Sequence, residues 1–259
     1  MNQQYKIILS FDVEEFDLPL EYGQSISEAD QMLIGNNGLT AITSLLQLHQ
    51  IETTLFTTAN FATHFPAEIR ALAQVHEIAS HSFYHSSFTV PDLLKSKQAL
   101  EQITGKEVIG LRMPRMLAVE MKDVVAAGYQ YDSSINPTYI PGRYNNLQLP
   151  RKLYLQEGML RLPVSVTPKL RFPLFWLSFK NLPYAIFKQM AIQTLKNDGY
   201  LSLYFHPWEF TDISHIKVPF YTKRQSGNRL LKKLHQLIID LKKEGTFCSI
   251  QNLLTTQSI

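Results

Sequence analysis

Short apolar runs and segments of helical spacing alternate along most of the chain. Residues 7–11 form an apolar run bounded by charged residues, which is typical of a strand buried on both faces. Alternating strands and helices predict a parallel sheet with helices outside it, either closed into a barrel or left open and doubly wound. Further strands are expected at 53–59, just before 81, and at 108–111, 129–132, 152–156, 159–166, 200–205 and 246–250. Helices are expected at about 38–49, 64–74, 91–105, 117–127, 184–197 and 227–243, with a loop over 17–36.

One domain over residues 1–259 is the expected organisation. Single α/β barrel domains reach this length, and no linker, repeat or low-complexity segment divides the chain. The net charge of +3 comes without a cluster of lysine and arginine, so nucleic acid is not an expected partner. The single cysteine, Cys248, excludes an internal disulfide and fits a reducing compartment.

The N-terminal run and the hydropathy of the chain predict a cytoplasmic protein. Asp12 is reached before any apolar stretch is long enough for a signal peptide. No segment approaches about 18 uninterrupted apolar residues, so we expect no membrane-spanning helix.

Two histidines, His81 and His85, stand four residues apart directly after an expected strand. On one helical turn, such a pair projects from the same face, so two ring nitrogens can converge on one metal ion. Eight histidines in the chain make a chance pair of this spacing common. The interpretation therefore needs a third ligand.

Carboxylates at the end of the first strand can supply that ligand. Residues i and i+2 of an extended chain point to the same side, so Asp12 and Glu14 are expected to face one pocket. One carboxylate can join the two imidazoles in a site that leaves a position open for water and substrate, and the other is then free to act as a base. The alternative is that Asp12 caps a loop and that residues 14–17 are a solvated acidic run.

Three further segments bring polar groups to strand ends, where ligands bind in such folds. Arg112 follows a strand and can keep a carboxylate ionised, or it is a surface arginine beside Pro114. Asp132 can orient an imidazole or cap the next segment. His206 ends an apolar strand, and Trp208 offers a flat face for a sugar ring; the alternative is a core histidine.

Taken in order, these segments resemble the polysaccharide deacetylase family, the NodB-homology domains of carbohydrate esterase family 4. The resemblance runs from Ile7 to about Leu254 and implies a distorted, incomplete (β/α) barrel of seven strands. In that family, Asp12 matches the catalytic base. In a branch of the family the two acids are spaced by one residue, and Glu14 falls on the position of the metal-binding acid, with glutamate in place of aspartate.

The remaining motifs of the family also find counterparts in this chain. His81 and His85 match its His-x-x-x-His metal motif. Arg112 and Pro114 match its Arg-x-Pro motif, in which the arginine pairs with the base. The resemblance assigns His206 as the general acid and, more loosely, Asp132 to the fourth motif. Contacts with substrate are expected from Pro114, Tyr204 and Trp208.

The resemblance implies a metal-dependent hydrolase that removes an N-acetyl group from an amino sugar of a bacterial cell-surface glycan or its precursor. Zn²⁺ is the first choice of ion, and Fe²⁺, Co²⁺ or Ni²⁺ suit the same ligands. Two alternatives stay open, namely an amidohydrolase of cyclic amides on the same fold and a metal-free carbohydrate-binding relative. Assays on N-acetylated glycans and on cyclic ureides separate the first alternative, and metal content separates the second.

The segment 171–180 places large apolar side chains between basic residues. One hypothesis is contact with a membrane surface, which would suit a lipid-linked sugar and a protein at the inner face of the membrane. The alternative is that these side chains cover the barrel.

Overall fold

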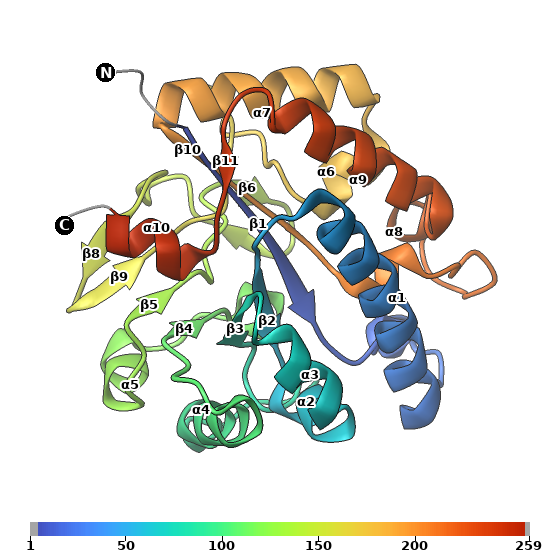
Figure 1. The fold of residues 1–259 in the computed structure, drawn as a ribbon, viewed down its shortest axis with the longest axis vertical. Helices are drawn as coiled ribbons and strands as arrows, with labels where there is room; N and C mark the ends of the chain where they lie inside the picture. Colours follow the sequence, from blue (N-terminus) through green and yellow to red (C-terminus); the bar gives the residue numbers. More distant parts are fainter. Residues whose placement is uncertain (1–4, 257–259) are drawn as a thin grey trace.

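A curled sheet lies at the centre of the computed structural model, which describes residues 5–256 (Figure 1). Its strands are β1 (Lys6–Val13), β2 (Thr54–Thr57), β3 (Glu77–Ser80), β4 (Gly110–Leu111), β5 (Tyr131–Asp132), β8 (Tyr154–Gln156), β9 (Met159–Arg161), β10 (Tyr200–Phe205) and β11 (Thr246–Phe247). They follow the order β10-β1-β2-β3-β4-β5-β9-β8, with β11 also paired to β1. All pairings from β10 to β9 are parallel, and β8 is antiparallel to β9. The predicted distorted, incomplete barrel is confirmed as a mixed α/β domain with a curled, half-barrel sheet, but the sheet has nine strands among residues 5–256 instead of the expected seven.

Helices follow one another around the outside of this sheet (Figure 1). They are α1 (Glu28–His49), α2 (Ala59–His64), α3 (Pro66–Leu72), α4 (Pro91–Thr104), α5 (Met121–Ala126), α6 (Trp176–Asn181), α7 (Tyr184–Asp198), α8 (Phe220–Lys223), α9 (Asn228–Leu241) and α10 (Ile250–Thr256). Short 3₁₀ turns are η1 (Leu18–Tyr22), η2 (Pro114–Met116) and η3 (Pro207–Phe210), and β6 (Tyr139–Ile140) pairs with β7 (Tyr144–Asn145) in a separate hairpin.

The alternation of side chains along β1 separates the core from the site. Leu9 and Phe11 pack into the large cluster that the outer helices share. Ile8 packs on the other face of the strand, with Phe56 and Tyr131, inside the curled sheet. Ser10 and Asp12 follow on that inner face, because successive strand residues alternate between faces. The inside of the barrel is therefore apolar near the start of β1 and polar at its carboxyl end.

Helix α1 begins ten residues earlier than the sequence predicts, so the expected loop over 17–36 is wrong for its last part. The Ser27 side chain caps the helix by accepting a hydrogen bond from the Asp30 backbone N–H at 3.1 Å. Gly35 and Gly38 weaken the sequence signal for this part of the helix, since glycine is a poor helix former. Their role is tertiary, because a Cβ on Gly38 would lie 1.9 Å from the backbone oxygen of Pro207.

Replacing Gly38 with alanine is expected to lower the free energy of unfolding by about 2 kcal/mol or more, because helix and η3 must move apart. Urea unfolding followed by circular dichroism measures this. Asn37→Ala is the matched control, since Asn37 is exposed on the same helix and alanine is the better helix former there. Equal stability of the two variants would contradict the close approach of α1 to η3.

Several predicted boundaries are corrected by local chemistry. The helix expected over 64–74 is α3, which Pro66 begins, and α2 precedes it in a stretch for which no helix is predicted. The strand expected over 159–166 ends as β9 at Arg161; beyond it, Ser165 exchanges two hydrogen bonds of 2.9 Å with Ser202 of β10. The expected strand 246–250 shortens to β11, and α10 begins at its last residue, where no helix is predicted.

Within residues 5–256, none of the helices has both the length and the apolar character that crossing a membrane requires. Residues 1–4, which begin the N-terminal run considered above, lie outside the described residues.

Candidate active site

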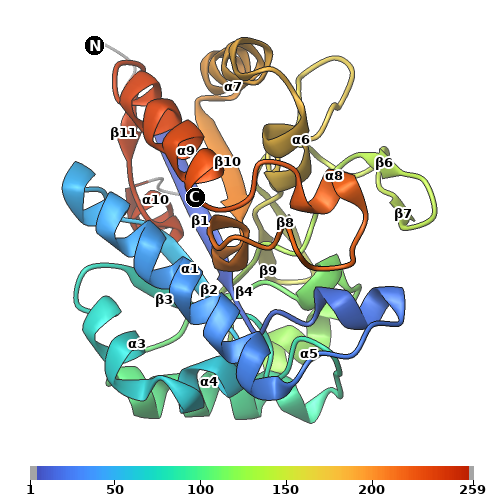
Figure 2. The same cartoon turned by 90° about the vertical axis from the view of Figure 1, so that its right-hand side faces the viewer.

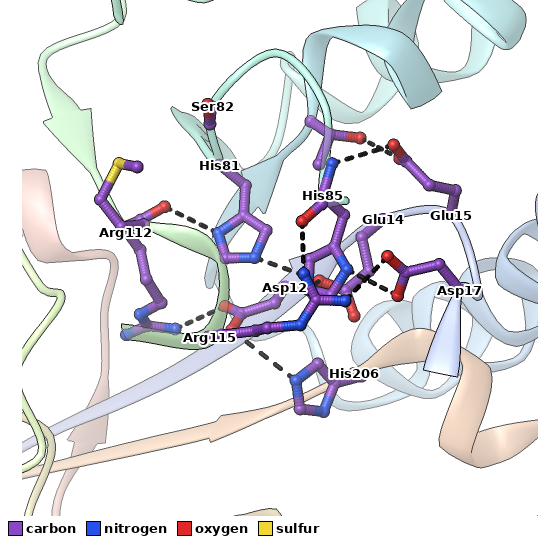
Figure 3. Close-up of polar contacts among 12 residues, drawn as sticks. Asp12, Glu14, Glu15, Asp17, His81, Ser82, His85, Arg112, Arg115 and His206 are labelled. Atoms are coloured by element: carbon purple, nitrogen blue, oxygen red, sulfur yellow. Dashed lines mark hydrogen bonds and ion pairs between the residues drawn. The ribbon is translucent and has the colours of Figure 1, made fainter. Parts of the chain in front are cut away.

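A pocket of about 280 Å³ opens at the carboxyl ends of the strands. Chain segments nearly 200 residues apart meet there, as parallel strands dictate. Figure 3 shows most of the polar side chains of its floor pointing toward one another. The predicted site residues that line it are Asp12, Glu14, His81, His85, Tyr204, His206 and Trp208.

Glu14, His81 and His85 form a buried cluster with the geometry of a metal site. Glu14 Oε2 lies 3.1 Å from His81 Nε2 and 3.2 Å from His85 Nε2. No other group of three or more such ligands was found among residues 5–256. Two imidazoles and one carboxylate are a donor set that suits Zn²⁺ and related divalent ions.

The hydrogen bonds of the two imidazoles test whether this cluster fits a metal ion. His81 Nδ1 lies 2.7 Å from the backbone oxygen of Arg112, and His85 Nδ1 lies 2.7 Å from Asp17 Oδ1. Both partners accept, so each Nδ1 carries a hydrogen, and Nε2 of each ring is the nitrogen that faces Glu14 and would offer its lone pair to an ion that replaces the proton there. Glu14 Oε2 is buried without a hydrogen-bond partner. Three lone pairs that converge in a buried space fit a cation.

The electrostatics of the cluster agree with that interpretation. Burial alone would raise the pKa of Glu14, but the imidazoles of His85, His206 and His81 outweigh it and hold that pKa well below its usual range. Burial would lower the pKa of His85, but the charges of Glu14 and Asp17 raise it to about 9. The cluster therefore strongly favours a positive charge beside Glu14.

The histidine pair lies on a loop, so the expected helical turn is wrong. After β3 the chain turns at Ser82, whose φ is 64°. The backbone N–H of His85 donates to Glu15 Oε1 at 3.0 Å, and the Thr58 hydroxyl donates to Glu15 Oε2 at 2.6 Å. Tertiary hydrogen bonds thus bring His81 and His85 together in place of helical geometry.

The acidic run 14–17 is buried rather than solvated, which overturns the alternative considered for it. Glu15 and Asp17 are 4% and 2% exposed. Asp17 accepts from the His85 ring and, at 2.9 Å, from Arg115. The roles of Glu15 and Asp17 are not among the predictions from the sequence. A signal was present, since Phe16, which is fully buried, interrupts the acidic run, and a large apolar residue is unusual in a solvated loop.

Arg112 pairs with Asp12, as the sequence predicts for a carboxylate on the rim. Arg112 NH1 lies 2.7 Å from Asp12 Oδ1, and its guanidinium lies 4.0 Å from the centre of the Phe56 ring. Ser10 and Ser133 accept its other hydrogen bonds. Arg112 is fully buried, so the surface alternative is wrong, and the guanidinium holds the Asp12 carboxylate in a buried ion pair.

His206 faces Asp12 across the pocket floor. Its Nε2 lies 3.9 Å from Asp12 Oδ2, while its Nδ1 lies 3.2 Å from Glu209 Oε1. Glu209 Oε2 in turn lies 3.0 Å from Lys180 Nζ, and both of these side chains are fully buried. The chain Lys180–Glu209–His206 was not anticipated, although Glu209 follows His206 by three residues in a Pro-initiated turn, which places the two side chains together.

The charges around His206 favour its protonated form. Burial would lower its pKa, but Glu14, Glu209 and Asp12 raise it by more, so the pKa lies above its usual value. Burial would raise the pKa of Glu209, but Lys180 and His206 lower it. An ionised Glu209 and a cationic His206 therefore support each other.

Asp132 does not orient an imidazole among the contacts of the described residues. Its Oδ2 lies 2.9 Å from Arg161 Nε and accepts from the Ser134 backbone N–H at 3.1 Å. It thus caps the next segment, the alternative considered for it, while Glu209 and Asp17 are the carboxylates that hold histidines.

Pro114 begins η2 and is buried outside the pocket lining, so its expected substrate contact has no support in this geometry. The Trp208 ring stacks on the His206 ring, with centroids 4.9 Å apart, and its indole N–H donates to Glu14 Oε1 at 3.0 Å. Trp208 is 3% exposed. This packing gives Trp208 a positioning role and leaves little of its face for a sugar.

The segment 171–180 contributes mainly to the core and the pocket. Phe179 is fully buried, and Phe175 and Trp176 line the pocket. The alternative in which these side chains cover the barrel therefore accounts for Phe175, Trp176 and Phe179, whereas Phe172 is 38% exposed, and contact with a membrane stays a prediction.

Comparison with known proteins identifies a family whose sequence model includes most of the site residues described above. A sequence model of the polysaccharide deacetylase family matches residues 7–131. This part of the chain belongs to the polysaccharide deacetylase family. The resemblance in the sequence is confirmed, and the matched stretch contains Asp12, Glu14, His81, His85 and Arg112. No match to the chain was found among curated proteins.

Solved structures share the fold at low identity. One described as a polysaccharide deacetylase from Pseudomonas aeruginosa is 15% identical, with a TM-score of 0.67 over 96% of this chain and 89% of that one. An allantoinase is 16% identical, with a TM-score of 0.66 over 96% and 88%. A pseudoenzyme of carbohydrate esterase family 4 from Bacillus anthracis is 12% identical, with a TM-score of 0.55 over 98% and 66%. At these identities, the structures establish the common fold alone.

Proposed function

We propose that this deacetylase relative removes the N-acetyl group from an amino sugar by metal-dependent hydrolysis. Family membership supports a hydrolase of the carbohydrate esterase type. The observation that carries the proposal is the buried Glu14–His81–His85 cluster, set beside an Asp12–His206 pair whose side chains lie 3.9 Å apart. A base and an acid next to three convergent ligands are the groups that amide hydrolysis requires.

The residues of the floor divide the chemistry between them. A divalent ion held by Glu14, His81 and His85, with Zn²⁺ as our proposal, would supply polarisation of the acyl carbonyl and a water of lowered pKa. Asp12, which is paired with Arg112, accepts a proton from the attacking water. His206 donates a proton to the nitrogen as the C–N bond breaks. The products are acetate and the amine of the sugar.

Asp12 and His206 must hold opposite protonation states for this division to work. Arg112 forms an ion pair with Asp12, and Glu209, itself paired with Lys180, favours the cation of His206. Two buried charge networks thus assign the roles of base and acid before substrate binds.

The Glu209→Gln variant is expected to shift the alkaline limb of the kcat/KM profile to lower pH. Glu209 is one of the charges that raise the pKa of His206, so its removal lets His206 lose its proton at a lower pH. At pH 8, kcat/KM should fall on the order of tenfold. A pH–rate profile checks this, with Glu157→Gln as the control at an exposed carboxylate. An unshifted alkaline limb would show that Glu209 does not set the protonation of His206.

Two other functions are alternatives to this proposal, namely an amidohydrolase of cyclic amides and a metal-free binding protein. The fold is shared with an allantoinase and with a pseudoenzyme, so the fold does not separate the three functions. Elemental analysis of protein purified without chelator, followed by acetate assays on N-acetylhexosamines and ring-opening assays on cyclic ureides, separates the three. A metal-bound protein that releases acetate supports our proposal. Such an enzyme would act on a cell-surface glycan or its precursor, with the cytoplasm as its proposed location.

A further inference from the structure

Five segments enclose the pocket floor, and we call them the pocket wall: η1, η2, the β6–β7 hairpin, α6 and α8. Each contributes side chains to the lining. Figure 2 shows the hairpin, α6 and α8 next to one another on one side of the molecule. Whether these segments leave gaps between them decides how a substrate can enter.

The segment η1 is joined to three of its neighbours. Glu21 binds Arg115 of η2 at 2.5 Å, and its other oxygen lies 3.4 Å from Arg143 of the hairpin loop. On its other side, the hydroxyls of Tyr22 and Tyr221 lie 3.4 Å apart and join η1 to α8. These contacts link residues that are about 90 to 200 positions apart in the chain.

The remaining contacts between segments of the pocket wall are made by packing and by a hydrogen bond from a side chain to the backbone. Ile140 of the hairpin packs into the cluster of Phe175 and Tyr204, which also includes Trp176 of α6. Asn181 at the end of α6 donates to the backbone oxygen of Tyr221 in α8 at 2.8 Å. The wall is therefore continuous around the floor, from η1 through the hairpin, α6 and α8 back to η1.

A continuous wall limits what can reach Asp12 and His206. Pockets for drug-sized ligands measure about 300 to 1,000 Å³, so a volume of about 280 Å³ suits a small ligand such as a single sugar ring with its acyl group. An internal unit of a polymer extends in two directions from the reacting centre and needs a groove that is open at both ends. A pocket that is enclosed by a continuous wall admits only a sugar whose attached chain or carrier leaves in one direction, through the pocket mouth.

We infer that the substrate presents a single N-acetylated sugar at a chain end or on a carrier, rather than an internal unit of a glycan. This inference rests on the proposed function, since it concerns which acetyl groups the same site can reach. The wall selects against internal units by steric exclusion, which is a specificity of position and not of sugar identity.

Defined oligosaccharides test the inference. The holoenzyme is incubated with N-acetylated glucosamine, galactosamine and mannosamine and with a tetramer of N-acetylglucosamine, and tandem mass spectrometry locates each free amine. We expect amines on the monosaccharides or on one terminal unit of the tetramer. Internal amines at rates similar to terminal ones would overturn the inference and leave the proposed function intact. Acetate release from none of these substrates would overturn both.

A variant in which the pocket wall is opened provides a matched comparison with the parent enzyme. Tyr221→Ala removes the joint between η1 and α8 and is expected to raise the internal share of deacetylation of the tetramer at least about fivefold. Phe220→Ala is the control, because Phe220 is its neighbour, is 69% exposed and does not line the pocket. An internal share that is no higher in Tyr221→Ala than in Phe220→Ala would show that the wall does not exclude internal units.

Discussion

Replacing His81 with alanine is expected to remove the bound divalent ion and to lower acetate release by about 10³-fold or more. His81 Nε2 is one of three ligand atoms around the same buried point, and two ligands hold such an ion poorly. Loss of the ion removes several kcal/mol of transition-state stabilisation, and about 1.4 kcal/mol corresponds to tenfold in rate. Elemental analysis and acetate assays on the same preparation measure both effects.

His215→Ala is the matched control for that experiment, since His215 is exposed and lies outside the site. It should retain both metal and activity. A His81→Ala protein that keeps one equivalent of metal and a near-normal rate would show that the cluster is not the metal centre. If the parent protein binds no divalent ion under any condition, the metal-free binding protein becomes the better interpretation.

Replacing Asp12 with asparagine is expected to lower kcat by about 10² to 10⁴-fold, the usual contribution of a general base. Asparagine keeps the shape of the side chain but cannot accept the proton. Metal content should persist, because Asp12 is not one of the three clustered ligands. The free energy of unfolding should fall by about 2 kcal/mol, because Arg112 loses its charged partner while keeping its bonds to Ser10 and Ser133.

Circular dichroism at the assay temperature and elemental analysis separate the loss of the base from loss of fold or metal. Asp212→Asn, at an exposed carboxylate, is the control and should leave the rate unchanged. If Asp12→Asn retained more than about a tenth of the parent rate, another group would have to act as the base. Retained metal with lost turnover would distinguish Asp12 from Glu14, because replacement of Glu14 should remove both the bound metal and the turnover.

Much of the fold could be predicted because the signals are local. The apolar run of β1, the strand before His81 and the strand ending at His206 were each recognised from short stretches. Once the sheet is parallel, topology brings the ends of such strands to one rim, so Asp12 and His206 could be placed together. Alternation along an extended chain likewise predicted that Asp12 and Glu14 share a side.

The boundaries that failed depend on contacts outside the local stretch. The first half of α1 carries glycines that disfavour a helix, yet Gly38 is needed where the helix meets Pro207. The loop from His81 to His85 has no helical periodicity to detect, since Glu15 fixes it through the His85 backbone. Neither requirement can be deduced from the residues nearby in sequence.

The sequence by itself predicted most of the alternating strands and helices, the candidate metal-ligating and acid–base residues, and the family that the first half of the chain matches, because each is recorded in residue type and spacing. Only the tertiary structure decided which carboxylates hold the histidines, namely Asp17 for His85 and Glu209 for His206. It also decided that a continuous wall encloses the pocket. Those features depend on distances between side chains far apart in the chain, which are set by how the sheet curls and how the loops pack.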